Sequence, residues 1–248
     1  MGTIYILWLR QIKRYYRSKA RLVGSLGQPL LFLLALGFGF GPIFEKAGQG
    51  NYIQFLVPGI IAMSILFTAI FSGMEIIWDR QFGFLKETLV APVSRFKIML
   101  GRTLGGATVA LCQGIIVFLL SLLLGFKIAS WWMLPIAFVF MMLIALLFTA
   151  LGTAIASMLD DMQGFQLIMS FLVMPIFFLS GALFPILSLP PVMKAIVHFN
   201  PLSYGVDAIR WSFTGIDSFP IMLSAIVLVV LTFIFIFVGA LLFSKMEV

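Results

Sequence analysis

Long apolar runs alternate with short polar segments along the 248 residues of the chain. A helix that crosses a bilayer needs ~20 mostly apolar residues at a rise of ~1.5 Å per residue. The pattern therefore predicts an all-α membrane protein with one transmembrane domain over residues 1–248. Six stretches meet the length requirement and predict six transmembrane helices: Leu22–Phe44, Ile53–Ile77, Leu104–Phe126, Trp131–Leu159, Phe165–Leu187 and Phe219–Phe243.

Composition supports a membrane protein rather than a soluble one. Hydrophobic residues make up 62% of the chain and charged residues only 10%, whereas a soluble domain is typically ~45–50% apolar. The formal net charge of +7 could suggest a nucleic-acid ligand, but the basic residues sit beside the apolar runs, where they set membrane orientation. We therefore expect membrane lipid, and no nucleic acid, as a partner.

Lys and Arg are distributed unevenly about the predicted spans. Twelve of the 16 fall on one side of a six-span chain, namely before the first span, between the second and third, and after the sixth. The other four are Lys46, Lys127, Lys194 and Arg210. Because basic loops tend to stay in the cytosol, both termini of this multi-pass chain are predicted to be cytosolic.

Residues 1–21 predict a helix that lies on the membrane surface. Arg10, Arg14, Arg17 and Arg21 are spaced by four, three and four residues and form one stripe. Such a stripe would place its cations against the phosphates of the inner leaflet. A simpler interpretation, a basic anchor that only orients the first span, stays open.

The chain offers few groups that could perform chemistry. His198 is its one histidine, and no His, Cys or carboxylate cluster has metal-ligand spacing. No GxxxxGK[ST] phosphate loop and no GxSxG elbow occurs. The glycines of residues 37–41 fall inside a span, where they favour close helix packing. We therefore expect neither an enzyme nor a cofactor or metal in this chain.

The middles of the predicted spans lack charged residues, so the chain shows no site for ion-coupled transport. Glu75, near the end of the second span, is the acid that comes closest to a span interior. It is predicted either to sit in water or to pair with Arg80 or with a basic residue of the amino-terminal helix. A transporter of this kind would take its energy from a partner.

A charged segment lies between the second and third spans. Phe82, Leu85 and Leu89 have the spacing of one apolar helix face. Pro92 should end that helix, and Ser94 can cap the next one. A short helix followed by a rigid turn is suited to fit a groove on a soluble partner, although a merely solvated loop stays open as the alternative.

Residues 188–218 predict two short amphipathic helices on the outer side, before the sixth span. Prolines can start both helices, and Asp207 and Arg210 can form an i,i+3 ion pair. The helices would either cover the exit of a pathway or form a packed external cap without a role in transport. The residues expected to build this external re-entrant pair are Asn200, Pro201, Tyr204, Asp207 and Arg210.

Two stretches resemble the permease subunit of type-2 ABC transporters: FLKETLVAPVSRFKIMLGR at 84–102 and PIFFLSGALFPILSLPPVMKAIVHFNPLSYGVDAIR at 175–210. The likeness is greatest to bacterial drug-resistance, daunorubicin-type and nodulation-factor exporters. The order of the elements is similar too. It comprises an amino-terminal interfacial helix (1–21), spans one to five (22–187), external re-entrant helices (188–218), and span six with a cytosolic tail (219–248).

The resemblance implies an exporter in the cytoplasmic (inner) membrane of a prokaryote. Two copies of the permease would pair, and each would bind one copy of a separate cytosolic ATPase, which holds ATP and Mg²⁺. The segment after the second span would be the coupling helix that fits a cleft on the ATPase. The residues that would make this contact are Phe84, Leu85, Glu87, Leu89, Pro92, Ser94 and Arg95.

The resemblance also implies a substrate path at the dimer axis, lined in part by the first, second and fifth spans. Side chains of the fifth span would suit an amphipathic cargo such as a drug, a lipid or a lipid-linked glycan, although they could instead face lipid. Two other functions remain open: an exporter of polysaccharide or lipid-linked glycan with the same architecture, and a membrane sensor or channel that does not pump. The path residues are Met169, Met174, Phe177 and Phe178.

Overall fold

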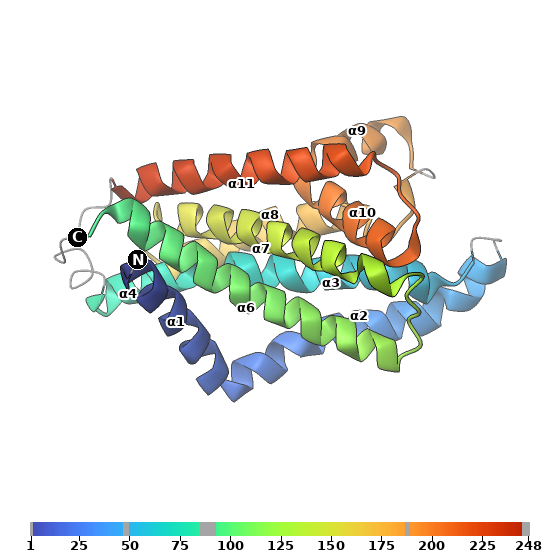
Figure 1. Cartoon of the computed structure of the whole chain (residues 1–248), viewed down its shortest axis with the longest axis horizontal. Coiled ribbons are helices and arrows are strands. Elements are labelled where there is room, and N and C mark those ends of the chain that lie inside the picture. The colour runs from blue at the N-terminus through green and yellow to red at the C-terminus, as the bar shows by residue number, and fades with distance from the viewer. Residues whose placement is uncertain (1, 47–49, 85–92, 187–188, 245–248) are drawn as a thin grey trace.

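All regular elements in the described part of the chain are helical. The computed structural model describes residues 2–46, 50–84, 93–186 and 189–244. Its helices lie in one elongated bundle, with α1 meeting α2 at an angle along one edge (Figure 1). In chain order they are α1 (Gly2–Arg17), α2 (Lys19–Lys46), α3 (Tyr52–Phe71), α4 (Met74–Gln81), α6 (Arg95–Leu123), the 3-10 turn η1 (Trp131–Met133), α7 (Leu134–Ala156), α8 (Met162–Phe178), α9 (Pro191–Phe199), α10 (Pro201–Thr214) and α11 (Ile221–Ser244).

Helix α3 occupies the centre of the bundle. It contacts α2, α6, α7 and α10, and its side chains Leu56, Ile60 and Ile61 are fully buried. Helices α2 and α11, by contrast, turn much of their apolar surface outward. In a bilayer that surface meets lipid or another protein rather than water.

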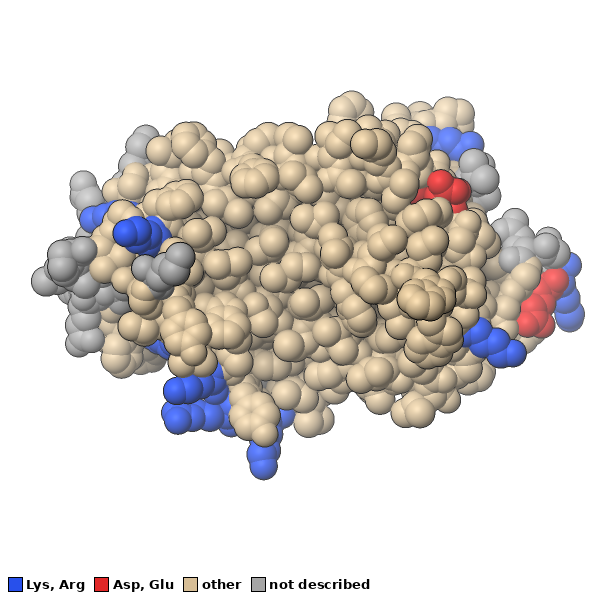
Figure 2. All heavy atoms as spheres, viewed as in Figure 1, with Lys and Arg blue, Asp and Glu red and all other residues tan. Residues whose placement is uncertain are grey.

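Charged side chains gather toward the two ends of the bundle. On the face shown in Figure 2, they leave a broad uncharged band between those ends. The start of α1, helix α4 and the end of α11 lie at the left end of Figure 1, called here the α4 end, whereas α9 and α10 lie at the right end, called the α10 end. An uncharged band between two polar ends is the pattern expected of a chain that crosses a membrane.

Among the described residues, five helices are long and apolar enough to cross a membrane, and they match five of the six predicted spans. The span predicted at Phe165–Leu187 corresponds to the shorter helix α8, which ends at Phe178. Its 17 residues extend ~26 Å, slightly less than the ~30 Å bilayer core. The chain turns at Gly181, where φ is 72°. It then folds back on α3, since Tyr52 donates its hydroxyl hydrogen to the carbonyl of Leu183 over 3.2 Å.

The second predicted span, Ile53–Ile77, is divided into α3 and α4 by a break at residues 72–73. There the backbone approaches α7 so closely that a Cβ on Gly73 would overlap the carbonyl of Gly152. A Cβ on Gly152 would in turn lie 2.5 Å from the carbonyl oxygen of Ile70. Such close packing of small residues supplies attraction between helices where water does not drive them together.

We predict that Gly152→Ala destabilises the bundle, because the added methyl group meets backbone, which cannot move aside. Overpacking of this kind costs ~1–3 kcal/mol, so the midpoint of thermal unfolding in detergent should fall. Gly27→Ala is the matched control, since a Cβ there meets nothing within 4 Å, and its midpoint should stay or rise. Equal midpoints in the two variants would contradict the close contact of α3 with α7.

Candidate functional site

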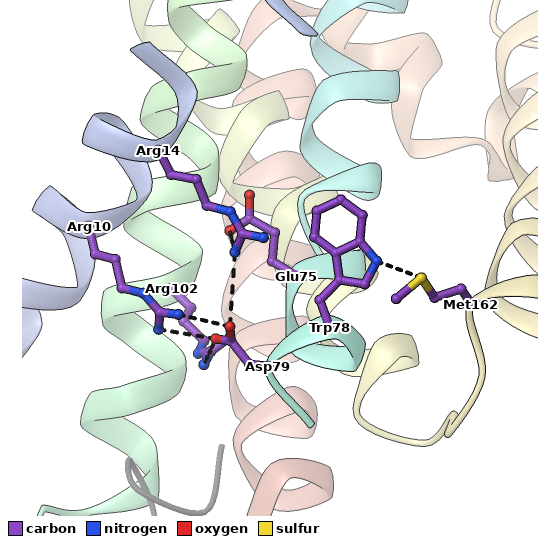
Figure 3. A network of polar contacts seen from close by, with 7 residues as sticks. All are labelled: Arg10, Arg14, Glu75, Trp78, Asp79, Arg102 and Met162. Atoms are coloured by element: carbon purple, nitrogen blue, oxygen red, sulfur yellow. Dashed lines mark hydrogen bonds and ion pairs between the residues drawn. The ribbon is translucent and has the colours of Figure 1, made fainter. Parts of the chain in front are cut away.

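Buried charges join three helices at the α4 end. Asp79 of α4 lies between Arg10 of α1 and Arg102 of α6 (Figure 3). Arg10 donates to both carboxylate oxygens, over 2.8 and 3.1 Å, and Arg102 Nη2 donates to Oδ2 over 2.6 Å. Asp79 and Arg102 are each only 3% exposed. Because a two-pronged arginine–carboxylate contact is directional as well as strong, these bonds specify how the three helices sit together.

A second acid and an aromatic ring extend this group, called here the Asp79 cluster. A guanidinium nitrogen of Arg14 lies 3.7 Å from a Glu75 oxygen and 3.9 Å from an Asp79 oxygen. The same guanidinium lies over the Trp78 ring, 5.1 Å from its centroid, which adds a cation–π attraction. Trp78 Nε1 in turn contacts the sulfur of Met162 on α8 (Figure 3). The cluster therefore reaches from α1 to α8.

Matching spacings on two helices explain this pairing. Glu75 and Asp79 lie four residues apart on α4, as do Arg10 and Arg14 on α1, so each pair occupies one helix face. The predicted pairing of Glu75 with the amino-terminal helix is confirmed, and the alternative of a carboxylate in water is wrong, since Glu75 is buried. The roles of Asp79 and Arg102 were not predicted. The shared four-residue spacing is the signal that could have found Asp79.

Helix α1 packs along α6. Gly101 and Gly105 of α6 form a small-residue face, and a Cβ on Gly105 would lie 2.6 Å from Cγ of Gln11 on α1. Farther along the contact, Trp8 Nε1 donates to the hydroxyl of Thr108 over 3.0 Å. The amino-terminal helix is thus part of the bundle, whatever lipid it also touches.

The four arginines predicted to meet lipid phosphates differ in their surroundings. Arg10 and Arg14 point to the acids of the Asp79 cluster while keeping about a third of their side-chain surface exposed. Arg17 is exposed, and the side chain of Arg21 lies outside the described part of the chain. Contact with lipid stays a prediction for all four, and two of them have protein partners besides.

The Asp79 cluster also closes the base of the charged segment at 85–92. Helix α4, which carries Asp79, leads into that segment, and α6, which carries Arg102, follows it. The ion pair between these two residues therefore ties the chain that enters the segment to the chain that leaves it. Aromatic side chains near this base are exposed: Phe82, Phe84 and Phe96.

The residues predicted to contact an ATPase are described in part. Ser94 occupies the N-cap position of α6 with an extended backbone, although its side chain makes no capping hydrogen bond. Arg95 Nη1 donates to the carbonyl of Phe243 at the end of α11, over 3.4 Å, and Phe84 is exposed. The other four lie outside the described residues: Leu85, Glu87, Leu89 and Pro92.

At the opposite end, α9 and α10 form the predicted pair of short helices. Asn200 caps α10 by accepting a backbone N–H of its first turn over 3.0 Å, and Pro201 is the first helical residue, as predicted. The Asn200 amide also donates to the carbonyl of Ile176 on α8, over 2.6 Å. Tyr204 donates its hydroxyl hydrogen to the carbonyl of His198 over 2.8 Å. The Asn200 bond attaches the helix pair to the end of α8, and the Tyr204 bond joins α10 to α9.

Asp207 and Arg210 do not form the predicted ion pair with each other. Asp207 instead accepts the backbone N–H groups of residues 218–219 over 2.9 Å, just before α11. Arg210 Nη2 donates to the carbonyls of Gly181, over 3.0 Å, and Phe55, over 3.4 Å. Its guanidinium carbon lies 4.0 Å from the centroid of the Phe55 ring. Arg210 thus ties α10 to α3 and to the turn after α8.

Burial shifts the pKa of both groups. It lowers the pKa of Arg210 to about 10, against the opposing effect of the Asp207 charge, so the guanidinium stays protonated at neutral pH. It raises the pKa of Asp207, while the N–H donors of Phe219 and Ser218 act in the other direction. The nearest hydrogen-bond partners of Asp207 and Arg210 are backbone groups rather than each other.

Two cavities lie along the seam between α2 and α3. The first, of about 260 Å³, has a wall of mixed character that includes Ser25, Gln28, Ser64, Thr68, Phe67 and Phe71. The second, of about 170 Å³, is closer to the α10 end and has an apolar wall that includes Phe32, Leu36, Phe40 and Phe178. Both are large enough to hold water, and the mixed wall of the first is suited to an amphipathic molecule.

The four predicted path residues of α8 do not share one environment. Phe178 lines the second cavity, and Met174 is exposed on the outside of the subunit. Met169 and Phe177 are fully buried in the core of the same chain. A role in substrate transport stays a prediction for all four.

We predict that removing Asp79 alone destabilises the protein more than removing Asp79 and Arg102 together. Asp79→Leu leaves the buried Arg102 without its carboxylate, which costs ~3–5 kcal/mol, whereas an apolar double replacement is often nearly neutral. Arg102→Met should cost less, because Asp79 keeps its two hydrogen bonds from Arg10. The midpoint of thermal unfolding of the double variant should therefore lie above the additive expectation. Arg80→Met is the control, because Asp160, its ion-pair partner among the described residues, is 81% exposed and surface pairs contribute only ~0–1 kcal/mol. Strict additivity would contradict the pairing.

Comparison with known proteins identifies the family. Residues 3–214 match the ABC-2 type transporter family. The inner membrane transport permease YadH of Escherichia coli (strain K12) is 29% identical over 90% of this chain and 88% of that protein. Nodulation protein J of Rhizobium leguminosarum bv. trifolii is 30% identical over 83% of this chain and 76% of its own length. The putative transport permease ycf38 of Cyanophora paradoxa is 29% identical over 85% and 74%.

These matches confirm the resemblance carried by the stretches at 84–102 and 175–210. Members of the matched family are the membrane components of transporters, and the several apolar helices of this chain agree with such a role. The chain belongs to the ABC-2 type transporter family.

Proposed function

We propose that this chain is the membrane subunit of an ATP-driven exporter and works as a pair of copies with two cytosolic ATPase subunits. The observation that carries the proposal is the base of the segment at 85–92. There the ion pair of Asp79 with Arg102 braces both arms of the segment, and aromatic side chains nearby are exposed. Exposed aromatic side chains at a polar end are suited to burial by a protein partner. ATP and Mg²⁺ would be bound by that partner.

Energy would enter the permease through this brace. Closure of the two ATPases around ATP would push the segment at 85–92, and the braced helices α4 and α6 would carry the displacement into the bundle. Helix α1 would follow, because it is hydrogen-bonded to both. The two permease copies would then rock, and the path would change from open at the α4 end to open at the α10 end.

The seam between α2 and α3 supports an amphipathic cargo such as a drug, a lipid or a lipid-linked glycan. Its first cavity combines polar and apolar side chains, and its second is apolar. Helices α2 and α8 also expose apolar side chains that a second copy could cover, among them Leu31, Phe38, Phe171 and Met174. A path at the axis of such a dimer would be lined by both copies.

The membrane and the orientation follow from the relatives and from charge. The relative in Escherichia coli is described as an inner membrane permease, and we assign this chain to the same kind of membrane. The α4 end, with the basic amino-terminal helix, would face the cytosol. The α10 end would face outward.

We predict that single cysteines at the two ends react with membrane-impermeant maleimide from opposite sides. In a Cys112→Ser background, which removes the native thiol, Lys127→Cys and Lys194→Cys should be labelled on intact cells. Lys97→Cys should be labelled only after the cells are opened. Labelling of positions 97 and 127 from the same side would overturn this orientation.

We predict that Glu87→Arg weakens binding of the ATPase while leaving the permease inserted in the membrane. Reversing a charge in a buried interface commonly costs ~2–5 kcal/mol, or roughly thirty- to several-thousand-fold in affinity. The measurements are pull-down of the ATPase and ATP hydrolysis in lipid vesicles. Pro92→Ala should act differently, because it would loosen the turn that the sequence predicts there, and should reduce transport more than binding.

Glu45→Arg is the matched control, since it reverses an exposed acid near the end of α2 and should change neither measurement. Wild-type binding and hydrolysis in Glu87→Arg would mean that the segment is only a solvated loop. If no ATPase co-purifies with the unmodified chain, a sensor or channel becomes the better function.

A further inference from the structure

A cavity at the α10 end contains a buried cation. The cavity has a volume of about 330 Å³ and lies where the end of α2, the start of α3 and the end of α10 meet. Arg210 forms part of its wall and is only 4% exposed. The wall also carries polar side chains from three segments: Asn51, Gln54, Thr214, Asp217 and Ser218.

Arg210 has no ion-pair partner among the described residues. Its hydrogen bonds go to the carbonyls of Gly181 and Phe55, and its Nε has no hydrogen-bond partner among the described residues. Asp207, the acid one turn earlier, is held by the N–H groups of residues 218–219. Arg210 also lies over the Phe55 ring and is attracted by the charge of Asp207, but neither contact is an ion pair. A buried cation without an ion-pair partner is costly, and an anion in the cavity would offset that cost.

An apolar cavity adjoins the charged one. It is the 170 Å³ cavity at the α10 end of the α2–α3 seam. Phe44 lines the 330 Å³ cavity and Tyr52 lines the 170 Å³ cavity, and the centroids of their rings are 4.9 Å apart. Residues 185–186 line the charged cavity, and the preceding residues 183–184 line the apolar one. A cavity of mixed lining that holds a cation and several polar side chains therefore lies next to an apolar cavity, which is the arrangement that the two parts of an amphiphile require.

We propose that these adjoining cavities bind an amphiphile that carries an anionic phosphate or carboxylate group, with the anion at Arg210 and the apolar part against Phe40 and Phe178. A planar guanidinium matches the oxygens of both groups, and the side chains of Asn51 and Ser218 offer further donors. The assignment of an anionic group to the exported cargo rests on the proposed function. The binding itself needs no ATPase.

Bilayer phospholipids and soluble amphiphiles share this chemistry, so the test uses one probe of each kind. The purified chain, without ATPase, is placed in phosphatidylcholine nanodiscs and titrated with dodecyl phosphate, with dodecanol as the neutral comparison. A second preparation contains phosphatidylglycerol, and retained lipid is measured by native mass spectrometry. Dodecyl phosphate should bind at least about tenfold more tightly than dodecanol, as expected for hydrogen bonds to a charged group.

Four variants locate the site. Arg210→Met should weaken binding of dodecyl phosphate about tenfold to a hundredfold. Arg210 also holds α10 in place, so a second variant tests the wall without removing Arg210. Gln54→Glu keeps the size of the side chain and adds a competing carboxylate to the wall, and it should weaken binding of dodecyl phosphate. Asp217→Asn removes an acid from the wall and should strengthen binding. Lys127→Met is the control, since it removes an exposed cation from the same end, outside this wall.

Binding of both dodecyl phosphate and phosphatidylglycerol would show that the anionic group is the feature recognised. Retention of phosphatidylglycerol alone would identify the ligand as a bilayer lipid. Equal affinity for dodecanol and dodecyl phosphate, with no retained phosphatidylglycerol, would overturn the proposal. So would unchanged affinity in both Arg210→Met and Gln54→Glu. These measurements contain no ATPase, so their failure leaves the coupling experiment on Glu87 unaffected, and failure of that experiment leaves this one unaffected.

Discussion

The arrangement of the α4 end depends on the carboxylate of Asp79. A carboxylate removed from water is costly unless cations meet it in good geometry. Asp79 is met by Arg10 of α1 and Arg102 of α6, over 2.8 and 2.6 Å. The acid on α4 can therefore be satisfied only when all three helices are in place. The cost of leaving it unpaired selects one arrangement of these helices over others that would bury apolar surface equally well.

Close backbone contacts make that arrangement stiff. Gly105 lets α1 approach α6, and Gly73 with Gly152 brings the junction of α3 and α4 against α7. Packed interfaces of this kind have few voids and little compressibility, so side chains cannot absorb a displacement applied between α4 and α6. The displacement must move α1 and α7 as well. Such stiffness is what the proposed coupling of an ATPase to the base of the segment at 85–92 requires.

Local signals predicted the parts of the fold that local chemistry determines. The cap at Asn200 and the long apolar runs are examples. The early end of α8 was not predicted, because the apolar run in the sequence continues past Gly181, where the chain turns. The Asp79 cluster was missed for a different reason. The partners of Asp79 lie 69 and 23 residues away in the sequence, and a lone acid near the end of a span has the same pattern as one in water. Only the fold brings those partners together.

The spacing of Asp207 and Arg210 predicted an ion pair, and the fold satisfies both groups differently. A buried backbone N–H or carbonyl without a partner is costly, and the turns beside α10 present such groups to both side chains. Asp207 meets N–H groups before α11, and Arg210 meets carbonyls. The two ends of the molecule therefore use their charges in different ways. At the α4 end carboxylates pair with arginines and lock helices together. At the α10 end carbonyl groups and the Phe55 ring hold Arg210 without an ion pair among the described residues, which is the basis for proposing an anion there.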